Sequence, residues 1–301
     1  MDRSAPDRTE REVWIAPAKI NLWLHVGRRR EDEMHEVDTG YQAIDLADRV
    51  VISRAPEGVE VSCTVSGEFA AAVPQGEANL AARAARLLAE RTGHALRVGI
   101  EIEKRIPAGA GLGGASSDAA AVLLALARRF AVPDPEETLV DLAAELGADV
   151  PFFLEGGTQR ALGIGDALEP ARLTGERWGI LVWPGVEVST RDAYGWLDEA
   201  RGGADIPRFS PSGVVGRGND LEAVVCAHRP EVSRALEILA AGPARAVRMS
   251  GSGSAWYALY PTEADRDRDL PRVGQALGGV TAGRHWSFEC VDHGVRASAG
   301  R

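Results

Sequence analysis

The sequence predicts an α+β protein built from two domains. Its 301 residues are enough for two domains of ordinary size or one large one. Hydrophobic residues make up 45% of the chain and charged residues 26%, a balance typical of globular proteins with a substantial core. Strand-like and helix-like segments are mixed without the steady rhythm of a doubly wound sheet. We therefore expect residues 12–160 to form an N-terminal domain and residues 161–292 a C-terminal domain.

Strands and one helix account for the first hundred residues. Residues 79–91 place apolar side chains at helical spacing, and Gly93 follows as a usual helix stop. The segments that alternate apolar and polar side chains, as half-buried strands do, are residues 19–26, 48–54, 59–65 and 96–102.

Two further helices are expected in the N-terminal domain. Residues 116–130 are rich in alanine and leucine. Asp134 is expected to cap the next helix with its carboxylate, because Pro135 suits the first helical position and acidic residues follow it. That helix is expected to stop near Gly147.

The C-terminal domain should mix both kinds of element. Helices are expected at residues 190–200, at 262–277 and twice within 219–241. Residues 201–218 are rich in glycine and proline and are interpreted as a loop. The segments interpreted as strands are residues 178–183, 244–249, 255–260 and 285–291.

Composition excludes several classes of protein. The net charge of −10 argues against nucleic acid as a partner, because duplex binding requires a basic face. No stretch approaches the roughly 20 apolar residues of a membrane span, and the polar residues 1–11 lack the apolar core of a signal peptide. We therefore expect no membrane association and a cytoplasmic location. Three widely spaced cysteines fit neither a zinc site nor a disulfide framework.

A glycine-rich loop is the strongest functional signal. Glycine permits positive φ and close approach of a ligand to the backbone, and the start of the following helix offers free N–H groups to an anion. We therefore predict that this loop binds phosphate, with Ser117 as a hydroxyl that could contact a metal; the alternative is a merely flexible turn. The loop lacks the lysine of a Walker motif and the context of a Rossmann motif. It comprises Pro107, Ala108, Gly109, Ala110, Gly111, Leu112, Gly113, Gly114, Ala115, Ser116 and Ser117.

Three other features are candidates for the same chemistry. Residues 250–253 (Ser-Gly-Ser-Gly) could form a second phosphate-facing loop or only a tight hairpin. Asp149, in an apolar setting, could be a general base or a turn aspartate. Lys19 and Lys104 are the only lysines among 34 basic residues, which suggests sites that need an ammonium group. Lys19 could equally be a surface strand end.

Together these segments resemble the GHMP kinases. The matching stretches are residues 16–22 (APAKINL), 104–117 (KRIPAGAGLGGASS), 147–151 (GADVP) and 249–253 (MSGSG). The resemblance implies a two-domain fold, with an N-terminal domain like the second domain of ribosomal protein S5 and a ferredoxin-like C-terminal domain. It also implies an active site between the two domains.

The resemblance further implies an activity and its residues. ATP, carried with Mg²⁺, would phosphorylate the 2-hydroxyl of a cytidine diphosphate-linked methylerythritol in non-mevalonate isoprenoid biosynthesis. Asp149 and Lys19 would be catalytic, and residues 107–117 would hold the ATP phosphates. Asn21, His35, Thr190 and Tyr194 would contact the substrate, the protein being a monomer or a homodimer.

One departure from the family pattern leaves the acceptor open. The family usually has Asp-Gly-Tyr-His where this chain has Asp-Glu-Met-His at residues 32–35. Met34 packs on a ring more softly than a tyrosine would. The alternatives are another GHMP kinase acting on a polyol, homoserine or a sugar, and a catalytically silent binding protein of the same fold.

Overall fold

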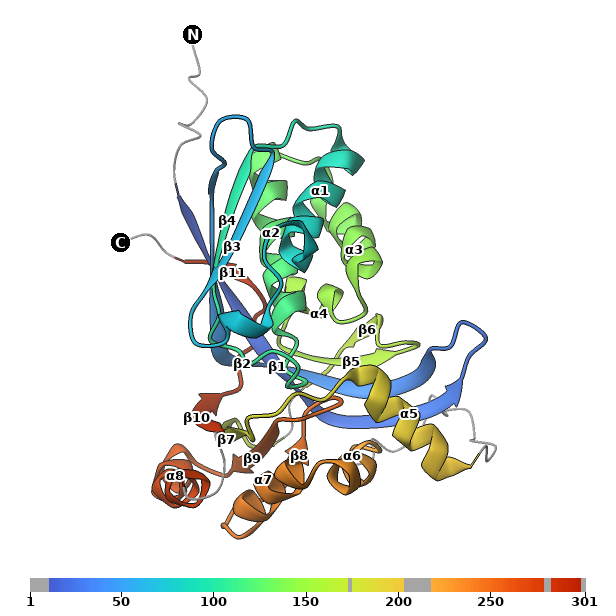
Figure 1. Cartoon of the computed structure of the whole chain (residues 1–301), viewed down its shortest axis with the longest axis vertical. Helices are drawn as coiled ribbons and strands as arrows, with labels where there is room; N and C mark the ends of the chain where they lie inside the picture. Colours follow the sequence, from blue (N-terminus) through green and yellow to red (C-terminus); the bar gives the residue numbers. More distant parts are fainter. Residues whose placement is uncertain (1–10, 173–174, 203–217, 279–282, 299–301) are drawn as a thin grey trace.

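A computed structural model describes residues 11–172, 175–202, 218–278 and 283–298. Its first sheet is built around a long antiparallel hairpin of β1 (Glu12–Arg29) and β2 (His35–Arg54) (Figure 1). The main strand order is β11-β1-β2-β4-β3, with β5 paired to β2 and β6 paired to β5. The other strands are β3 (Val61–Ser66), β4 (Val98–Glu103), β5 (Thr158–Leu162), β6 (Ala167–Pro170) and β11 (Arg296–Ala297).

Helices cover one face of this sheet. The parallel strands β3 and β4 are joined through α1 (Leu80–Thr92), which Asn79 caps by accepting the N–H of Ala81. The central helix is α2 (Gly114–Phe130), whose alanine and leucine side chains are almost all buried against α1 and β1. The remaining helices of this layer are α3 (Pro135–Leu146), α4 (Val150–Glu155) and short 3₁₀ turns at Ala70–Ala72 and Gly76–Ala78.

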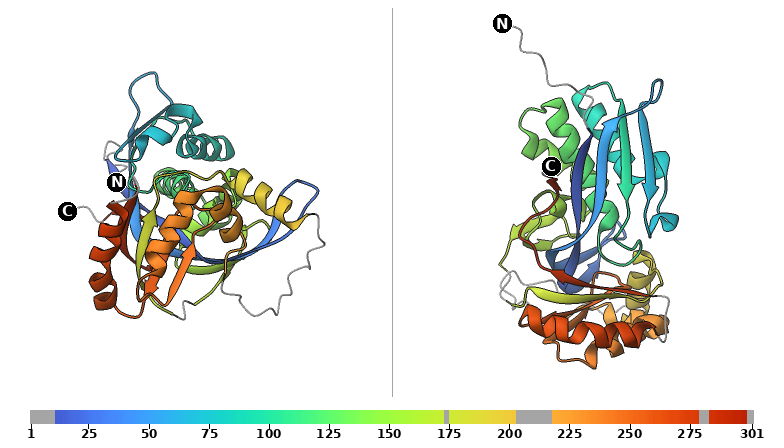
Figure 2. Two further views of the ribbon diagram at one scale, coloured as in Figure 1. Left: turned by 60° about the horizontal axis from the view of Figure 1, so that its bottom comes forward. Right: turned by 90° about the vertical axis from the view of Figure 1, so that its left-hand side faces the viewer.

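The second sheet is antiparallel, in the order β10-β7-β9-β8. Its strands and two of its helices, α7 and α8, follow one another as strand–helix–strand–strand–helix–strand, the ferredoxin-like pattern. These two helices lie on the outer side of the sheet, away from the first sheet (Figures 1 and 2). The elements are β7 (Trp178–Trp183), α5 (Thr190–Arg201), α6 (Glu222–His228), α7 (Pro230–Ala240), β8 (Ala246–Met249), β9 (Trp256–Tyr260), α8 (Glu263–Gly278) and β10 (Arg284–Glu289).

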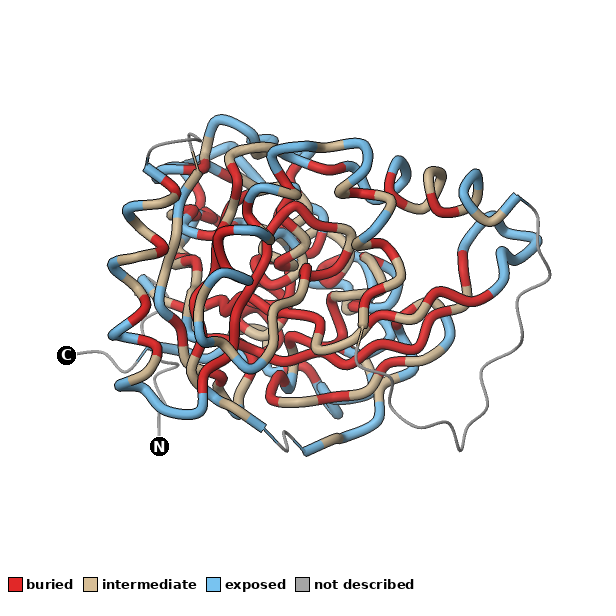
Figure 3. Tube along the Cα trace, turned by 90° about the horizontal axis from the view of Figure 1, so that it is seen from below, coloured by how far each residue is buried: buried red, intermediate tan, exposed pale blue. Residues whose placement is uncertain are grey.

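Strand β1 contributes to three hydrophobic clusters in turn. Trp14 packs beneath the first layer of helices, Ile20 between the two sheets, and Leu24 against the second sheet and its helices. Register shifts after Pro17 and Asn21 bend the strand between these clusters, since a bulge increases local twist. Buried residues therefore run through the centre of the molecule, with exposed turns outside (Figure 3).

The two-domain α+β prediction is confirmed, and most predicted elements are present with ends shifted by a few residues. The predicted cap of α3 is wrong, because the Asp134 side chain makes no capping hydrogen bond and its backbone is left-handed (φ 43°). Strands β1 and β2 are much longer than the predicted 19–26 and 48–54, and α4, β5, β6 and β11 were not predicted. The predicted loop at 201–218 lies almost wholly outside the described residues.

The division of the chain at residue 160 stays a proposal. Strands β6 and β11 belong to the first sheet although they lie beyond residues 160 and 292. Within the described residues, no helix is long and apolar enough to cross a membrane. Cys63 and Cys290 are buried and Cys226 is half-buried, and all three are free thiols.

Candidate active site

A cleft of about 900 Å³ lies where the two sheets meet. Elements from the whole chain form it: the middle of β1, the start of β2, the loop before α2, the start of α4, the first turns of α5 and the loop between β8 and β9. Every predicted site residue except Ser117 lines this cleft. The sequence patterns therefore converge on one place.

The glycine loop is a built structure and not a flexible turn. Gly109, Gly111 and Gly113 all have positive φ, of 60°, 76° and 72°. At Gly111 a Cβ atom would lie 2.1 Å from the carbonyl oxygen of Ser250, so no side chain fits there. Backbone hydrogen bonds hold the loop from both sides, with the N–H of Lys19 donating to Leu112 (3.0 Å) and that of Ala255 to Ala110 (3.1 Å).

Helix α2 begins at Gly114, directly after this loop. The N–H groups of a helix's first turn have no partner within the helix, and the positive end of the helix dipole lies there. Gly114, Ala115 and Ser116 line the cleft. The loop and the start of α2 therefore offer a set of backbone donors suited to phosphate oxygens.

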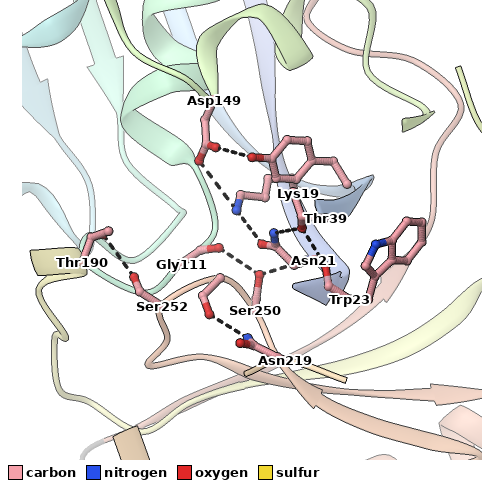
Figure 4. A network of polar contacts seen from close by, with 12 residues as sticks. Lys19, Asn21, Trp23, Thr39, Gly111, Asp149, Thr190, Asn219, Ser250 and Ser252 are labelled. Atoms are coloured by element: carbon pink, nitrogen blue, oxygen red, sulfur yellow. Dashed lines mark hydrogen bonds and ion pairs between the residues drawn. The ribbon is translucent and has the colours of Figure 1, made fainter. Parts of the chain in front are cut away.

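The loop at 250–253 packs directly against the glycine loop. Its Ser250 hydroxyl donates to the Gly111 carbonyl at 2.8 Å, which ties the two glycine-rich loops together. Asn219, which sequence reasoning missed, donates to the carbonyls of Met249 (3.0 Å) and Gly251 (2.7 Å). Thr190 at the start of α5 shares a 3.1 Å hydrogen bond with Ser252 (Figure 4). The loop is therefore part of the cleft and more than a hairpin turn.

Lys19 and Asp149 face each other at the centre of the cleft. The ammonium nitrogen lies 3.6 Å from Asp149 Oδ2 and donates to Asn21 Oδ1 at 2.6 Å (Figure 4). The Lys19 side chain is only 5% exposed, so it is not a surface strand end. Burial lowers the pKa of Lys19, although the Asp149 carboxylate partly offsets that effect.

Asp149 is held from its other side by Tyr41. The tyrosine hydroxyl donates to Asp149 Oδ1 at 2.9 Å. Burial, together with the nearby carboxylate, holds the pKa of Tyr41 well above its ordinary value. The Asp149 side chain is 34% exposed and caps no helix, so its open side faces the cleft. It is therefore not a turn aspartate that serves only the backbone.

Two residues of this network were missed because the first half of β2 was not predicted as a strand. Tyr41 holds Asp149, and Thr39 accepts a hydrogen bond from Asn21 at 2.7 Å. Thr39 in turn donates to the Trp23 carbonyl at 2.6 Å. The signal was available in the two-residue spacing of Thr39 and Tyr41, which places both side chains on one face of a strand.

A second group of side chains lies between the β1–β2 hairpin and α5. The His35 and Tyr194 rings are 5.0 Å apart and tilted by 43°. His35 Nε2 is 2.8 Å from Asp198 Oδ1, which fixes the orientation of the imidazole. Met34 is 46% exposed beside them and lines the cleft. Glu33 has a φ of 67°, the conformation that a glycine would adopt without strain.

Ser117 does not fit the role considered for it. It is fully buried, and its hydroxyl oxygen has no partner among the described residues. Ser116, one residue earlier, lines the cleft instead. Within the described ranges no group of three or more His, Cys, Asp or Glu side chains is placed to hold a metal ion.

Comparisons with known proteins agree with this geometry. Residues 79–157 match the family model for the GHMP kinases N terminal domain, and residues 207–278 match that for GHMP kinases C terminal. A 4-diphosphocytidyl-2-C-methyl-D-erythritol kinase from Halorhodospira halophila is 40% identical over 91% of this chain and 93% of its own length. The enzyme of that name from Anaeromyxobacter dehalogenans is 44% identical, over 90% and 88%.

Solved structures give the same picture. A crystal structure of 4-(cytidine 5'-diphospho)-2C-methyl-D-erythritol kinase is 36% identical, has a TM-score of 0.70 and covers 93% of this chain and all of its own. A homoserine kinase from Cytophaga hutchinsonii has a TM-score of 0.69 at 16% identity, over 99% of this chain and all of its own. The second likeness shows the fold alone.

Proposed function

The chain belongs to the GHMP kinases, and we propose that it transfers the γ-phosphate of ATP to the 2-hydroxyl of 4-diphosphocytidyl-2-C-methyl-D-erythritol. This reaction is a step in the non-mevalonate synthesis of isoprenoid precursors. The observation that carries the proposal is the Lys19–Asp149 pair, which lines the same cleft as the glycine loop. A base beside a phosphate-binding loop is the arrangement that phosphoryl transfer to an alcohol requires.

Asp149 is proposed to accept the proton of the attacking hydroxyl. Tyr41 and Lys19 occupy its two oxygens from the protein side and fix its orientation. The Lys19 ammonium offsets negative charge that develops on the transferred group. Asn21 holds that ammonium in place through its 2.6 Å hydrogen bond.

The triphosphate of ATP is proposed to lie on the glycine loop and the start of α2. Mg²⁺ would enter with it. The cleft beside the loop offers no cluster of three metal-ligating side chains in the described part of the chain. This fits an ion held mainly by phosphate oxygens, with the Ser116 hydroxyl as a contributing ligand. Once bound, the ion would neutralise triphosphate charge.

The cytidine end of the acceptor is proposed to lie between the β1–β2 hairpin and α5. Tyr194 would offer a ring face to the base, and His35, oriented by Asp198, would hydrogen-bond its edge. Thr190 lines the cleft one turn before Tyr194. Met34, at the position where the family usually has a tyrosine, lines the cleft beside these rings.

Arg191 is the cation best placed for the diphosphate of this acceptor. Among the described residues that line the cleft, Lys19, Lys104 and Arg29 each have an acidic partner within 4 Å, but Arg191 has none. Its guanidinium is exposed on the first turn of α5, between Thr190 and Tyr194. A free planar guanidinium suits two phosphate groups better than an ammonium does.

We expect Arg191→Gln to raise the KM for the cytidyl acceptor by about tenfold, the cost of roughly one charge-assisted hydrogen bond. The kcat and the KM for ATP should each change by less than about threefold, because Arg191 does not touch the reacting groups. Steady-state kinetics with each substrate varied in turn make the measurement. Arg172, exposed and outside the cleft, supplies the matched control Arg172→Gln. A tenfold rise in the KM for ATP instead would assign Arg191 to the other substrate.

A panel of acceptors tests the proposed function directly. ADP release, coupled to a spectroscopic readout, is measured with the cytidyl-methylerythritol compound, homoserine, mevalonate and galactose. We expect turnover with the cytidyl compound alone, because only it fills the His35–Tyr194 pocket. Turnover with a comparator and none with the cytidyl compound would assign the chain to another GHMP kinase activity, a reading that Met34 keeps open. ATP binding without turnover on any acceptor would indicate the silent binding protein.

A further inference from the structure

Lys104, the second lysine of the chain, has no part in the proposed reaction. Lys104, just after β4, is 2% exposed at its side chain and lies between two buried carboxylates. Its ammonium nitrogen donates to Asp118 Oδ2 on α2 at 2.8 Å and to Asp48 Oδ2 on β2. The side chains of Asp48 and Asp118 are 0% and 3% exposed. These three residues form what we call the Lys104 cluster.

The cluster joins three parts of the site. Asp48 Oδ1 accepts the backbone N–H groups of Arg105 (2.6 Å) and Ile106 (2.9 Å), the two residues just before the glycine loop. Lys104 then connects Asp48 to Asp118 in the second turn of α2. One connected network therefore fixes both the entry to the loop and the helix that the loop leads into.

The ammonium group also lies directly beneath the phosphate-binding surface. A Cβ atom at Gly114, the first residue of α2, would come within 3.1 Å of Lys104 Nζ. Lys104 itself lines the cleft. A displacement of its side chain would therefore move the residues whose N–H groups face the triphosphate.

The two carboxylates differ in the number of donors they accept. Asp48 accepts three, and although burial raises its pKa, Lys104 and the backbone N–H groups of Arg105 and Ile106 oppose that effect. Asp118 receives one, and its Oδ1 has no partner among the described residues. Burial raises the pKa of Asp118 to about 8, and the nearby Asp48 carboxylate adds to this effect while Lys104 opposes it. Because Lys104 donates to only one oxygen of Asp118, a single acceptor atom suffices there.

A purely structural reason for such a cluster is weak. Burying charged groups costs free energy that apolar side chains of similar volume do not incur. Ion clusters of this kind are most useful where they hold backbone in one defined arrangement. Here the backbone in question is that of the loop and its helix.

We propose that Lys104, Asp48 and Asp118 are positioning residues that hold the glycine loop and the start of α2 in their phosphate-binding arrangement before ATP arrives. The inference rests on the proposed function. It assigns the cluster to ATP affinity, through preorganisation of backbone donors, and not to acceptor binding. A loop released from the cluster would have to be ordered by the ligand at the cost of affinity.

Calorimetric titration of the intact protein with ATP, and separately with cytidine diphosphate as a probe of the acceptor pocket, tests this assignment. Lys104→Met, which keeps the length of the chain but removes the ammonium, should weaken ATP binding by about tenfold or more. Asp118→Ala should weaken it by a similar factor, whereas Asp118→Asn, which retains an uncharged acceptor, should stay within about threefold of wild type. Cytidine diphosphate affinity should change by less than about twofold in all three.

A matched control separates positioning from general loss of stability. Asp269 on α8 is also buried, at 5% exposed, and it does not line the cleft. Its carboxylate pairs with Arg272 on the same helix and accepts a hydrogen bond from Tyr260 on β9. Asp269→Asn should lower the melting temperature without changing either affinity. Wild-type ATP affinity in a folded Lys104→Met protein would overturn the inference. If that variant does not fold, equal affinities in Asp118→Ala and Asp118→Asn would overturn it.

Different results would contradict the proposed function and the inference about the Lys104 cluster. It would be seen in the wild-type protein, as absent ATP binding or absent turnover of the cytidyl acceptor. Failure of the inference would be seen as equal ATP affinities in wild type and variants. The two outcomes are read from different comparisons within one set of titrations.

Discussion

Replacement of Asp149 by asparagine is expected to lower kcat by about 10²- to 10⁴-fold, the range that a positioned general base supplies. The amide keeps the size of the side chain and an acceptor for the Tyr41 hydroxyl, but it cannot take a proton from the attacking alcohol. The affinity for ATP should stay within about threefold of wild type, because the proposed place of the triphosphate is on backbone N–H groups of the glycine loop and α2, not on Asp149. Single-turnover kinetics with saturating ATP separate the chemical step from binding.

The control for this variant is Asp45→Asn. Asp45 accepts the N–H of Glu289 at 2.9 Å and does not line the cleft. The amide keeps an oxygen that can accept this N–H, so the exchange should leave kcat unchanged. Near-normal turnover by Asp149→Asn would show that the hydroxyl loses its proton by another route, and Asp149 would then be an electrostatic and orienting group only.

Local patterns predicted those parts of the site that lie on consecutive residues. The glycine loop was visible because four glycines separate a clear strand from a clear helix. The positive φ angles of Gly109, Gly111 and Gly113 are the physical reason that glycine occurs there. Asp149 and Lys19 became candidates through their setting and the scarcity of lysine, and the family resemblance implied their catalytic roles.

The partners of those residues could not be predicted in the same way. Tyr41 is 108 positions from Asp149, and Asp48 is 56 positions from Lys104. Nothing in a local pattern brings such residues together. The pairing of β2 with β4 places Asp48 beside Lys104, and β5, which follows Asp149 and α4, pairs with β2 at Tyr41. The length of β2 was hidden as well, because its buried residues are shared among three clusters, with Val37, Tyr41 and Ile44 each in a different one, and show no single alternation.

The predicted capping of α3 by Asp134 is wrong for a reason of backbone conformation. Sequence signals identified the start of α3 correctly through Pro135. The residue before a proline is disfavoured from the right-handed helical region, and Asp134 adopts left-handed backbone instead, with φ 43° and ψ 58°. Its carboxylate therefore does not reach the N–H groups that an extended capping residue would satisfy.

Lys19→Met is expected to lower kcat by about 10²- to 10³-fold. This is the usual cost of removing one preorganised group that stabilises the negative charge developing in the transition state. Methionine keeps much of the buried stem and the packing around it, so the loss reports the ammonium. Removing that charge also leaves Asp149 held only by Tyr41. Asn21 would lose the partner of its carbonyl oxygen.

The lowered pKa of Lys19 also predicts how kcat should change with pH. Burial lowers the pKa of Lys19 from its ordinary value, so the ammonium is lost at a lower pH than that of an exposed lysine. The kcat of the wild-type protein should therefore fall on the alkaline side as pH rises through that lowered pKa. In Lys19→Met this alkaline fall should be absent, because the group that titrates is gone. An unchanged alkaline limb in the variant would assign that ionisation to another group, and a near-normal kcat would remove Lys19 from the reaction altogether.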